Sequence, residues 1–514
     1  MLRSVPLICR RAHATAAALT GLLLAGCPPP QCPRNPSGQF EDPEIKRLSP
    51  AQRDADLAAL GALLRDSYPH LQEKQRRFGV NVSAALSEQR EVLLQAVNRY
   101  QYMNAVDRIL LSFHDGHLTS RGYARTFART YRSALRRSQK GARPRPPAVL
   151  VGVGLTLRYV AGQVAVVRVR PGSPAERAGV RPGDVLLLVS DQPALSRMGS
   201  SLRWRSWARL AAGLQAAASR VMINRPWYPD TPLPRERLLI LRSGRRLRMT
   251  LVGARTPEVE TLKFGLRRLA CPAGAQDAVA VLRLGTFGGA RRRLWKRITE
   301  LLAEARTARA LVIDLRGNRG GSQGLARMLV ARLISRPVVA GEYRYLRTPV
   351  LMKKVPVIPT LRPDPADPRW TVWKKDIINP VKQPLALPAA ALVDELCASS
   401  CETVARALSA APGIKLYGRP TAGSSGLPVR VTLPHSRLII SVPSWQSRTA
   451  GGLPVEGSGV VPQVRVPLRL EALRAGVDAP LAQAVRDLCK GLATAARGLP
   501  RPRPAGKRAA QEIP

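Results

Sequence analysis

The residues with the clearest chemical potential are two adjacent serines, Ser399 and Ser400, in the segment CASSCE. They follow an apolar run, LALPAAALVDEL, in which residues 386–396 predict a buried strand, and they precede helical apolar spacing that ends near Ala411. A serine at such a helix N-terminus lies near unpaired backbone N–H groups and the positive end of the helix dipole, which favour an oxyanion. The pattern therefore predicts a nucleophilic serine, or a serine that only caps the helix together with Glu402.

A second segment, ALVIDLRGNRGGSQGLARML, joins an apolar strand at residues 310–315 to a glycine-rich turn and a helix. No GKS or GKT follows the glycines, so this is not a phosphate-binding loop, and the glycine spacing does not fit a dinucleotide-binding fingerprint. Glycines let backbone N–H groups approach a developing oxyanion without side-chain obstruction. This turn can therefore supply an oxyanion donor.

The element DLRGNRGG resembles the DLRxNxGG element of the tail-specific, or C-terminal processing, serine proteases. In that family the element supplies one oxyanion-hole N–H, which the resemblance places at Gly320 or its neighbour Gly321. The residue after the nucleophile supplies the other N–H, which here is Ser400. The family's nucleophile lies three residues before a glutamate, and counting back from Glu402 selects Ser399.

The general base follows from the same resemblance. One branch of the family uses a lysine in a TxGKG turn, but this chain reads TAGSSG, with Ser424 at the lysine position. The tricorn-like branch instead uses a histidine in a DGH motif and a glutamate in an EGxGVxPD segment. The segments FHDGHLTS and VEGSGVVPQ match these, which implies His117 as the base and Glu456 as the carboxylate that orients it. His114 is the alternative base, and the implied mechanism needs no metal or organic cofactor.

The segment AVLVGVGLTLRYVAGQVAVVRVRPGSPAERAGVRPGDVLLLV looks like a circularly permuted PDZ domain. Its GVGL loop matches the loop whose N–H groups hold a peptide's C-terminal carboxylate beside an open strand edge. That resemblance implies a peptide-binding loop made of Gly152, Val153, Gly154 and Leu155. A long helical insert at residues 195–236 departs from the family pattern and puts this groove in question.

The N-terminus predicts export. Basic residues precede an apolar stretch that is too short to span a bilayer and ends in LLAGC. This resembles a bacterial lipoprotein signal, which implies that Cys27 carries the lipid; an ordinary cleaved signal peptide is the alternative. The expected location is the cell envelope, with the chain anchored to a membrane, most simply the outer one.

Export changes the interpretation of the cysteines, because disulfides persist in oxidising compartments. Cys397 and Cys401 bracket the candidate nucleophile and could form a bridge, or they could be two buried free thiols. The chain has no CxxC pair, and its five histidines do not cluster with the cysteines, so we expect no metal site.

These patterns predict a multidomain α/β fold with a helical N-terminal subdomain, a PDZ-like β-rich domain and a catalytic core of crotonase-like ββα type. At 514 residues the chain is long enough for several cores. The expected divisions are a signal at 1–26, a proline-rich spacer at 27–48, a helical subdomain at 49–125, a PDZ-like domain at 148–254, a catalytic core at 257–468, a C-terminal helix at 469–498 and a disordered tail at 499–514.

The formal charge of +48 would suit nucleic acid or an anionic surface, but the arginines are scattered and are not interleaved with aromatic residues. We therefore expect no specific nucleic-acid partner. The favoured function is a membrane-anchored serine endopeptidase whose peptide or protein substrates are selected through the PDZ-like domain. The alternatives are an inactive homologue that binds peptides and an envelope scaffold that binds acidic polymers.

Overall fold

The computed structural model describes residues 42–123, 149–203, 208–219, 221, 225–227, 232–255, 264–271 and 278–497. The predicted signal, Cys27, residues 27–41 of the spacer and the predicted tail lie outside the described residues. Within the described part, no helix combines the length and the apolar character needed to cross a membrane.

The catalytic region is built on a six-stranded sheet in the order β11-β12-β13-β16-β17-β21. The strands from β12 onward run parallel, and β11 lies antiparallel at one edge. Strands such as AAALV in β16 are buried along their whole length, as expected for a sheet covered on both faces. The strands are β11 Phe264–Leu269, β12 Val279–Leu284, β13 Ala310–Asp314, β16 Ala389–Val393, β17 Lys415–Gly418 and β21 Val464–Arg465.

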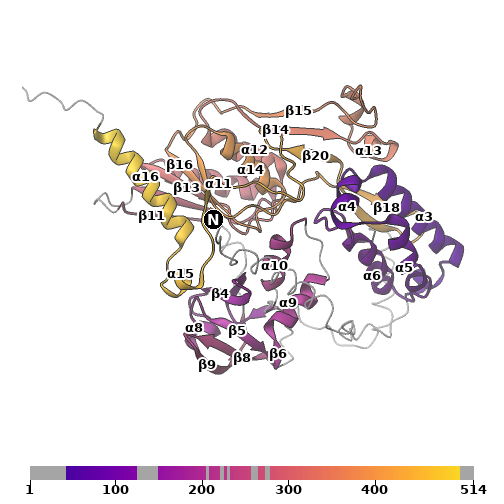
Figure 1. Ribbon diagram of the computed structural model, residues 1–514, viewed down its shortest axis with the longest axis horizontal. Coiled ribbons are helices and arrows are strands. Elements are labelled where there is room, and N and C mark those ends of the chain that lie inside the picture. The colour runs from indigo at the N-terminus through magenta and orange to yellow at the C-terminus, as the bar shows by residue number, and fades with distance from the viewer. Residues whose placement is uncertain are drawn as a thin grey trace, which may run out of the picture.

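Helices cover both faces of this sheet, as Figure 1 shows. Three of them form one hydrophobic core with one face, namely α11 Arg291–Ala305, α12 Gln323–Leu333 and α14 Ser400–Ala410. The long C-terminal helix α16, Ala479–Arg497, covers the other face, where Leu481, Ala484 and Val485 pack on the sheet. A disulfide from Cys489 to Cys271 joins α16 to the end of β11. The short helix α15, Leu470–Arg474, precedes α16.

The N-terminal region is helical and shares its core with strands that come much later in the chain. Its helices are α2 Pro43–Lys46, α3 Pro50–Ser67, α4 Leu71–Phe78, α5 Val82–Leu94 and α6 Arg99–Leu111. Side chains of Ser49, Asn81 and Asn98 cap the N-termini of α3, α5 and α6. The strand that follows, β1 Thr119–Tyr123, pairs with β19 Leu438–Val442, so the region is tied directly to the catalytic region.

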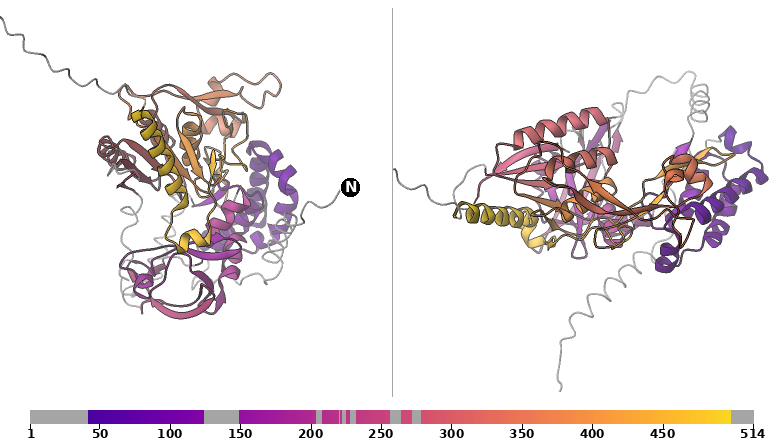
Figure 2. Two further views of the ribbon diagram at one scale, coloured as in Figure 1. Left: turned by 60° about the vertical axis from the view of Figure 1, so that its left-hand side comes forward. Right: turned by 90° about the horizontal axis from the view of Figure 1, so that it is seen from above.

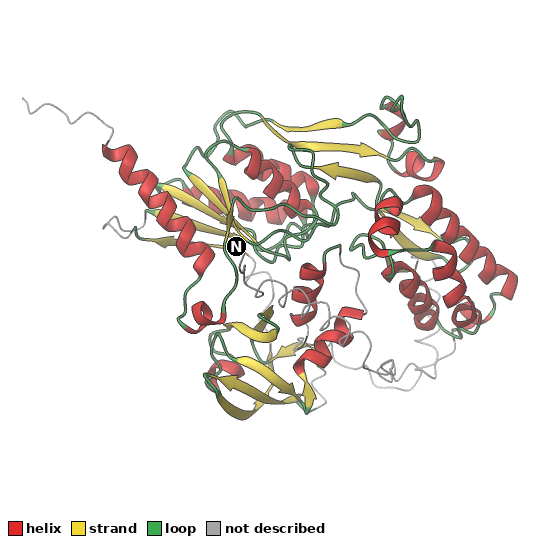
Figure 3. Cartoon of the chain, in the orientation of Figure 1, coloured by secondary structure: helices red, strands yellow, loops and turns green. Residues whose placement is uncertain are grey.

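Two three-stranded sheets extend the catalytic region toward these helices (Figure 3). One contains β1, β19 and β18 Val429–Thr432, and the other contains β14 Val338–Tyr345, β15 Lys374–Ile378 and β20 Trp445–Arg448. Helix α13, Pro349–Lys354, and a 3-10 turn at Ile358–Thr360 complete this part, and their residues join the helical core.

The PDZ-like region has its own hydrophobic core and lies below the other two in Figure 1. Its main sheet has the order β3-β4-β5-β8-β9, so β3 is an edge strand. The elements of this sheet are β3 Leu155–Val160, β4 Gln163–Val169, β5 Val185–Val189, β6 Gln192–Pro193, which pairs with β5, β8 Arg235–Arg242 and β9 Arg245–Val252. A smaller sheet joins β2 Val149–Gly152 to β7 Arg225–Trp227 and β10 Ala254–Arg255.

Three helices belong to the PDZ-like region, namely α8 Pro174–Arg177, α9 Ala194–Arg203 and α10 Leu210–Ala218. The last two fall within the expected helical insert at 195–236. The left view of Figure 2 shows this region below the catalytic region rather than within it. The architecture confirms the predicted multidomain α/β fold.

Candidate active site

Ser399 lies in a strained turn between β16 and α14. Its φ and ψ are 58° and −126°, in a region that non-glycine residues rarely adopt. Such a conformation persists only where the surroundings hold it, and it is typical of functional sites. A disulfide between Cys397 and Cys401, with Cα atoms 5.5 Å apart, spans the turn. Of the two alternatives left by the sequence for these cysteines, the structure has the bridge.

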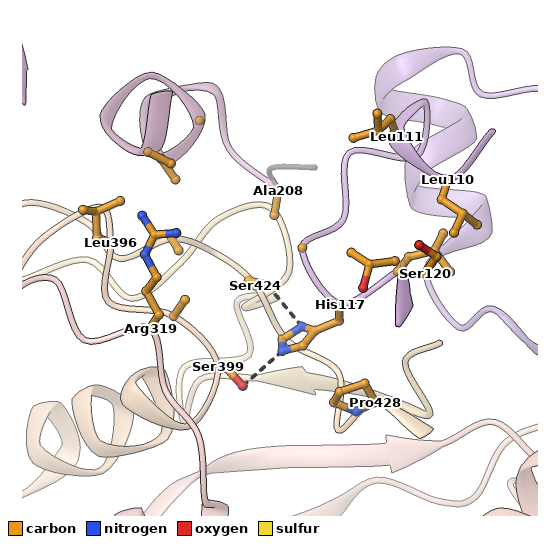
Figure 4. Close-up of a pocket in the computed structure, with 18 of the residues that line it drawn as sticks. Leu110, Leu111, His117, Ser120, Ala208, Arg319, Leu396, Ser399, Ser424 and Pro428 are labelled. Atoms are coloured by element: carbon orange, nitrogen blue, oxygen red, sulfur yellow. Dashed lines mark hydrogen bonds between the residues drawn. The ribbon is translucent and has the colours of Figure 1, made fainter. Parts of the chain in front are cut away.

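The hydroxyl of Ser399 faces the imidazole of His117, as Figure 4 shows. Its Oγ lies 3.0 Å from Nε2 of His117. His117 lies between α6 and β1 and is 7% exposed. Burial lowers the pKa of His117, partly offset by the negative charge of Asp115, which raises it. A neutral imidazole within hydrogen-bonding distance of a hydroxyl is able to accept its proton.

The second ring nitrogen of His117 has a partner that the resemblance did not imply. Nδ1 lies 3.1 Å from Oγ of Ser424, the residue at the position of the lysine in the other branch. With Nε2 accepting from Ser399, Nδ1 carries the proton and donates it to Ser424. The structure thus brings together two serines and one histidine.

Glu456 does not contact His117 directly, which corrects the predicted orienting bond. Among the described residues, its carboxylate accepts hydrogen bonds from the Nζ of Lys74 at 2.6 Å and from the N–H of Ser425 at 2.8 Å. Burial and the nearby Asp115 raise the pKa of Glu456, while Lys74 lowers it. Glu456 therefore acts on His117 through the residues Thr421–Gly426, which we call the catalytic loop.

Asp115 is the carboxylate whose charge acts most strongly on His117. Its Oδ1 accepts the backbone N–H of His117 at 2.7 Å, and its Oδ2 accepts the hydroxyl of Tyr68 at 2.8 Å. Lys74, His70 and His117 together hold the pKa of Asp115 below its usual value although burial opposes them. A buried carboxylate beside His117 stabilises the imidazolium that proton transfer creates.

A second buried carboxylate, Glu402, ties the catalytic loop to the nucleophile. It accepts hydrogen bonds from the Thr421 hydroxyl at 2.5 Å and from the N–H groups of Gly423, Ser424 and Ser399 at 2.7, 2.9 and 3.2 Å. Burial raises the pKa of Glu402 to about 7, and these four donors oppose that shift. Glu402 thus accepts a helix-capping hydrogen bond from the backbone N–H of Ser399, while the hydroxyl of Ser399 is hydrogen-bonded to His117.

Two backbone N–H groups beside Ser399 are suited to an oxyanion. Within the described part of the chain, neither the N–H of Gly321 nor that of Ser400 has a hydrogen-bond acceptor. The N–H of Gly320 instead donates to Oδ1 of Asn318 at 2.8 Å, so of the two predicted glycines Gly321 is the available donor. A Cβ on Gly320 would lie 2.8 Å from the Cβ of Ser399, which explains the glycine at the closest approach.

Ser399, His117, Ser424 and Gly321 all line a cavity of about 730 Å³. Helices α6 and α10 contribute another wall with the side chains of Leu110, Leu111, Ala212 and Ala216, and Ala208, just before α10, extends it. Charged groups are present as well, namely Asp107, Arg121, Arg319 and Glu395. The cavity is large enough for several residues of an extended peptide, and its apolar lining suits uncharged side chains.

His114, the alternative base, does not join this site. Its ring packs against Phe78 with centroids 4.4 Å apart, and its carbonyl accepts a hydrogen bond from Lys74. Burial lowers the pKa of His114 to about 4. The structure therefore favours His117 over His114.

The predicted peptide-binding loop spans the end of β2 and the start of β3. The carbonyl of Val153 accepts the N–H of Ala175 in α8, and that of Gly154 accepts the N–H of Arg170, just after β4. The N–H groups of Val153 and Gly154 have no acceptor in the described residues. The open edge of β3 is partly occupied, because the side-chain amide of Gln215 in α10 bonds both the N–H and the carbonyl of Tyr159, at 3.0 and 2.7 Å.

Among the described residues, one group of side chains has metal-ligand spacing. The ligand atoms of His70, Asp115 and Glu456 lie within 4.8 Å of one another. The ammonium of Lys74 already sits on Glu456, and the Tyr68 hydroxyl donates to Asp115. A lysine cation neutralises the carboxylates in place of a metal, so we assign no metal to this group.

Three residues of the site were not identified from the sequence: Ser424 as a partner of His117, and Asp115 and Lys74 as its charged surroundings. Asp115 stands inside the DGH motif itself, so the motif held the signal. Ser424 was noted only for the lysine that it replaces. Nothing in the helix LQEKQRRF distinguishes Lys74 from a surface lysine, because its burial depends on contacts with distant parts of the chain.

Comparison with known proteins covers most of this architecture. Residues 278–466 match the profile of peptidase family S41, and residues 166–202 match that of a PDZ domain. The C-terminal processing peptidase, chloroplastic, of Tetradesmus obliquus is 30% identical over 211 residues, which are 39% of this chain and 40% of that protein. The chain thus spans less than half the length of this relative.

Solved structures extend the likeness to most of the chain. Mature CPAF complexed with lactacystin has a TM-score of 0.63 and 15% identity, covering 87% of this chain and 99% of that chain. Mature CPAF has a TM-score of 0.62 and 16% identity, covering 86% and 98% of the two chains. At these identities the likeness shows a shared fold alone.

Proposed function

We propose that this chain is a serine peptidase that hydrolyses peptide bonds in peptide or protein substrates, on the premise that residues 278–466 match peptidase family S41 and residues 166–202 match a PDZ domain, as the motifs predicted. The observation that carries the proposal is the 3.0 Å contact between Ser399 Oγ and His117 Nε2 at the wall of a 730 Å³ cavity. The proposed chemistry requires no metal or organic cofactor.

In the first step, Ser399 Oγ attacks the carbonyl carbon of the scissile bond while its proton passes to Nε2 of His117. The negative charge that develops on the carbonyl oxygen is stabilised by the N–H groups of Gly321 and Ser400. Asp115 stabilises the imidazolium through its charge, and the Ser424 hydroxyl oxygen accepts a hydrogen bond from Nδ1–H and keeps the ring oriented.

In the second step, His117 gives its proton to the nitrogen of the leaving amine, and the C–N bond breaks. Water then enters, His117 takes a proton from it, and the hydroxide attacks the ester carbon of the acyl-enzyme. The bond to Ser399 Oγ breaks, and Oγ recovers its proton from His117. The products are an amine and a carboxylic acid, and the enzyme returns to its starting state.

The substrate class follows from the cavity and from the PDZ domain. The apolar wall formed by α6 and α10 favours uncharged side chains beside the scissile bond. Processing near the C-terminus of proteins is the corresponding proposal from the relative's name. Recruitment of a peptide by pairing with β3 would require Gln215 to release Tyr159, so we propose that access to the PDZ groove depends on movement of α10.

The test of activity uses the full-length protein and a fluorophosphonate probe. We expect the probe to label the wild-type protein on Ser399 alone, and we expect an unfolded protein substrate to yield new C-termini. Ser399→Ala should abolish both signals. Labelling at another serine, or equal cleavage by Ser399→Ala, would contradict the proposed nucleophile. Binding of unfolded protein without cleavage would support the inactive peptide-binding alternative.

We further propose that the protein is anchored in the cell envelope by a lipid on Cys27, on the basis of the LLAGC signal and the proline-rich segment after it. Cys27→Ser should leave the precursor unprocessed or release the protein from the membrane fraction. Metabolic labelling with a fatty-acid analogue should mark the wild type and not the variant. Equal labelling of the two proteins would contradict the anchor.

A further inference from the structure

A second cavity, of about 290 Å³, lies between the PDZ-like region and the catalytic region. Strands β3 and β4 form one side, the ends of the catalytic strands form another, and residues 467–480 around α15 close it. Neither Ser399 nor His117 lines this cavity. Its lining includes six arginines, namely Arg158, Arg168, Arg283, Arg316, Arg419 and Arg469, and only two acidic residues, Asp394 and Asp478.

The three arginines on the ends of the catalytic strands have carboxylate partners. Arg283 and Arg316 share Asp314, with nitrogen–oxygen distances of 2.8 and 2.9 Å. Arg316 also pairs with Asp478 at 2.7 Å. Arg419 pairs with Glu395 at 2.8 Å. These pairs hold Arg283, Arg316 and Arg419 in place on the catalytic side of the cavity.

The two arginines on the PDZ side lack such partners. Among the described residues, the one hydrogen bond of the Arg158 guanidinium is to its neighbour's carbonyl, Leu157 O, at 3.0 Å, and Arg168 makes no ion pair. The negative charge that acts most strongly on Arg158 is that of Asp394. Oδ1 of Asp394 accepts hydrogen bonds from the N–H groups of Gly317 and Leu396, at 2.7 and 3.1 Å. Both residues line the cavity, and most of their guanidinium donors have no acceptor among the described residues.

The energetics agree with this geometry. Burial lowers the pKa of Arg158, and Asp394 only partly offsets the loss of hydration. Partial loss of hydration lowers the pKa of Arg168, as do the positive charges of Arg283 and Arg316, while Asp314 raises it. Cations held this close to one another are stabilised by a bound anion.

We propose that this cavity is a binding site for a small organic oxyanion, whose phosphate or carboxylate group is held by Arg158 and Arg168. Planar guanidinium groups bind both kinds of oxyanion through two parallel hydrogen bonds. The apolar side chains of Val167, Leu473 and Val477 suit the carbon skeleton of such a ligand. This inference does not depend on the proposed peptidase activity.

The bound anion would connect the two regions. Arg158 and Arg168 belong to the PDZ sheet, whereas Arg283, Arg316 and Arg419 belong to the catalytic region. Glu395, the partner of Arg419, lines the 730 Å³ cavity of the active site. The ion pair between Arg419 and Glu395 therefore connects the basic cavity to the substrate site. An anion in the basic cavity can stabilise one position of the PDZ region relative to the catalytic region.

The test measures binding by the full-length protein in chloride buffer, by titration calorimetry, with inorganic phosphate, phenyl phosphate and benzoate as separate probes. We expect one site for at least one probe. Arg158→Gln and Arg168→Gln should each weaken binding at least about tenfold, the loss expected for a hydrogen bond to a charged group. Arg246→Gln removes one exposed positive charge from β9 and is the matched control.

A preference for phenyl phosphate over benzoate would assign a phosphate ester as the ligand, and the reverse preference would assign a carboxylate. Arg168→Gln lies on an exposed position and keeps the test valid if Arg158→Gln fails to fold. Absence of binding by all three probes would overturn the proposal. Equal weakening by Arg246→Gln would also overturn it, because binding would then follow net charge and not this cavity.

Discussion

The catalytic loop, Thr421–Gly426, lies between two buried carboxylates that hold it in different ways. On the nucleophile side, Glu402 receives four neutral donors and no cation. On the histidine side, Glu456 pairs with Lys74, and Asp115 lies close by. The first side therefore fixes positions, and the second controls charge around His117. Substitutions on the two sides should accordingly differ in kind: one set should disturb geometry, and the other should move the pH profile.

The largest effect expected is that of His117→Ala. Loss of the general base should lower turnover at least about a hundredfold, the lower end of general-base contributions. His114→Ala is the control, because His114 packs on Phe78 away from Ser399. Steady-state rates on one peptide substrate compare the two variants. Full activity in His117→Ala would contradict the role of His117 as the general base.

Glu402→Ala should be next in size. It leaves three donors without an acceptor, because the N–H of Ser399 also donates to the carbonyl of Ser424. Each buried orphan costs about 1–3 kcal/mol, so the free energy of unfolding should fall by at least about 3 kcal/mol. Displacement of Ser399 and Ser424 should lower turnover by up to about a hundredfold. Denaturant unfolding measures the first effect and steady-state kinetics the second. Glu300→Ala, at an exposed ion pair with Arg297, should leave both almost unchanged. A stable Glu402→Ala enzyme would contradict the positional role.

Variants on the histidine side should shift the pH dependence. Activity requires neutral His117, whose pKa lies below 6.5 because of burial, so the rate should fall at acid pH as the ring is protonated. The charge of Asp115 raises this pKa. Asp115→Asn should therefore lower it further and move the acid limb of kcat/KM toward lower pH.

Ser424→Ala removes a neutral hydroxyl from the same ring. Turnover should fall about tenfold, the effect of one lost hydrogen bond of about 1.4 kcal/mol, while the acid limb stays near its wild-type position. Profiles of kcat/KM between acid and neutral pH compare this variant with Asp115→Asn. An equal shift in both variants would show that charge and orientation are not separated in this site.

The smallest effect should follow loss of the bridge between Cys397 and Cys401. The bridge closes a very short loop, so its contribution to global stability is modest. The double change to alanine should lower turnover a few-fold through a looser Ser399 turn and leave the fold intact. Mass spectrometry of the non-reduced protein must show the bridge first. Alkylatable thiols at both positions would contradict the premise, whatever the rates show.

Sequence reasoning reached the fold class because apolar strands alternate with amphipathic helices and because short motifs mark three turns. Ser399, His117 and Gly321 meet as expected from those motifs. The predicted contact between Glu456 and His117 was wrong, because the position of Glu456 relative to His117 depends on where the catalytic loop places Ser424 and Ser425. Lys74 could not be predicted at all, since a lysine in a polar helix gives no sign of burial. The basic cavity was hidden for a similar reason: its arginines come from five separate segments.

The bridge between Cys271 and Cys489 bears on how such an enzyme survives its own activity. A peptidase of the proposed kind can cut neighbouring copies that unfold, so its lifetime depends on how rarely its chain opens. The two cysteines lie 218 residues apart and enclose almost the entire catalytic region. In the simplest model, a bridge that closes a loop of that length lowers the entropy of the unfolded chain and so stabilises the fold by about 5 kcal/mol. The same link retains α16 on the sheet after a single cut inside the loop. The bridge between Cys271 and Cys489 thus favours resistance to self-digestion, although it lies away from the residues of the proposed cleavage reaction.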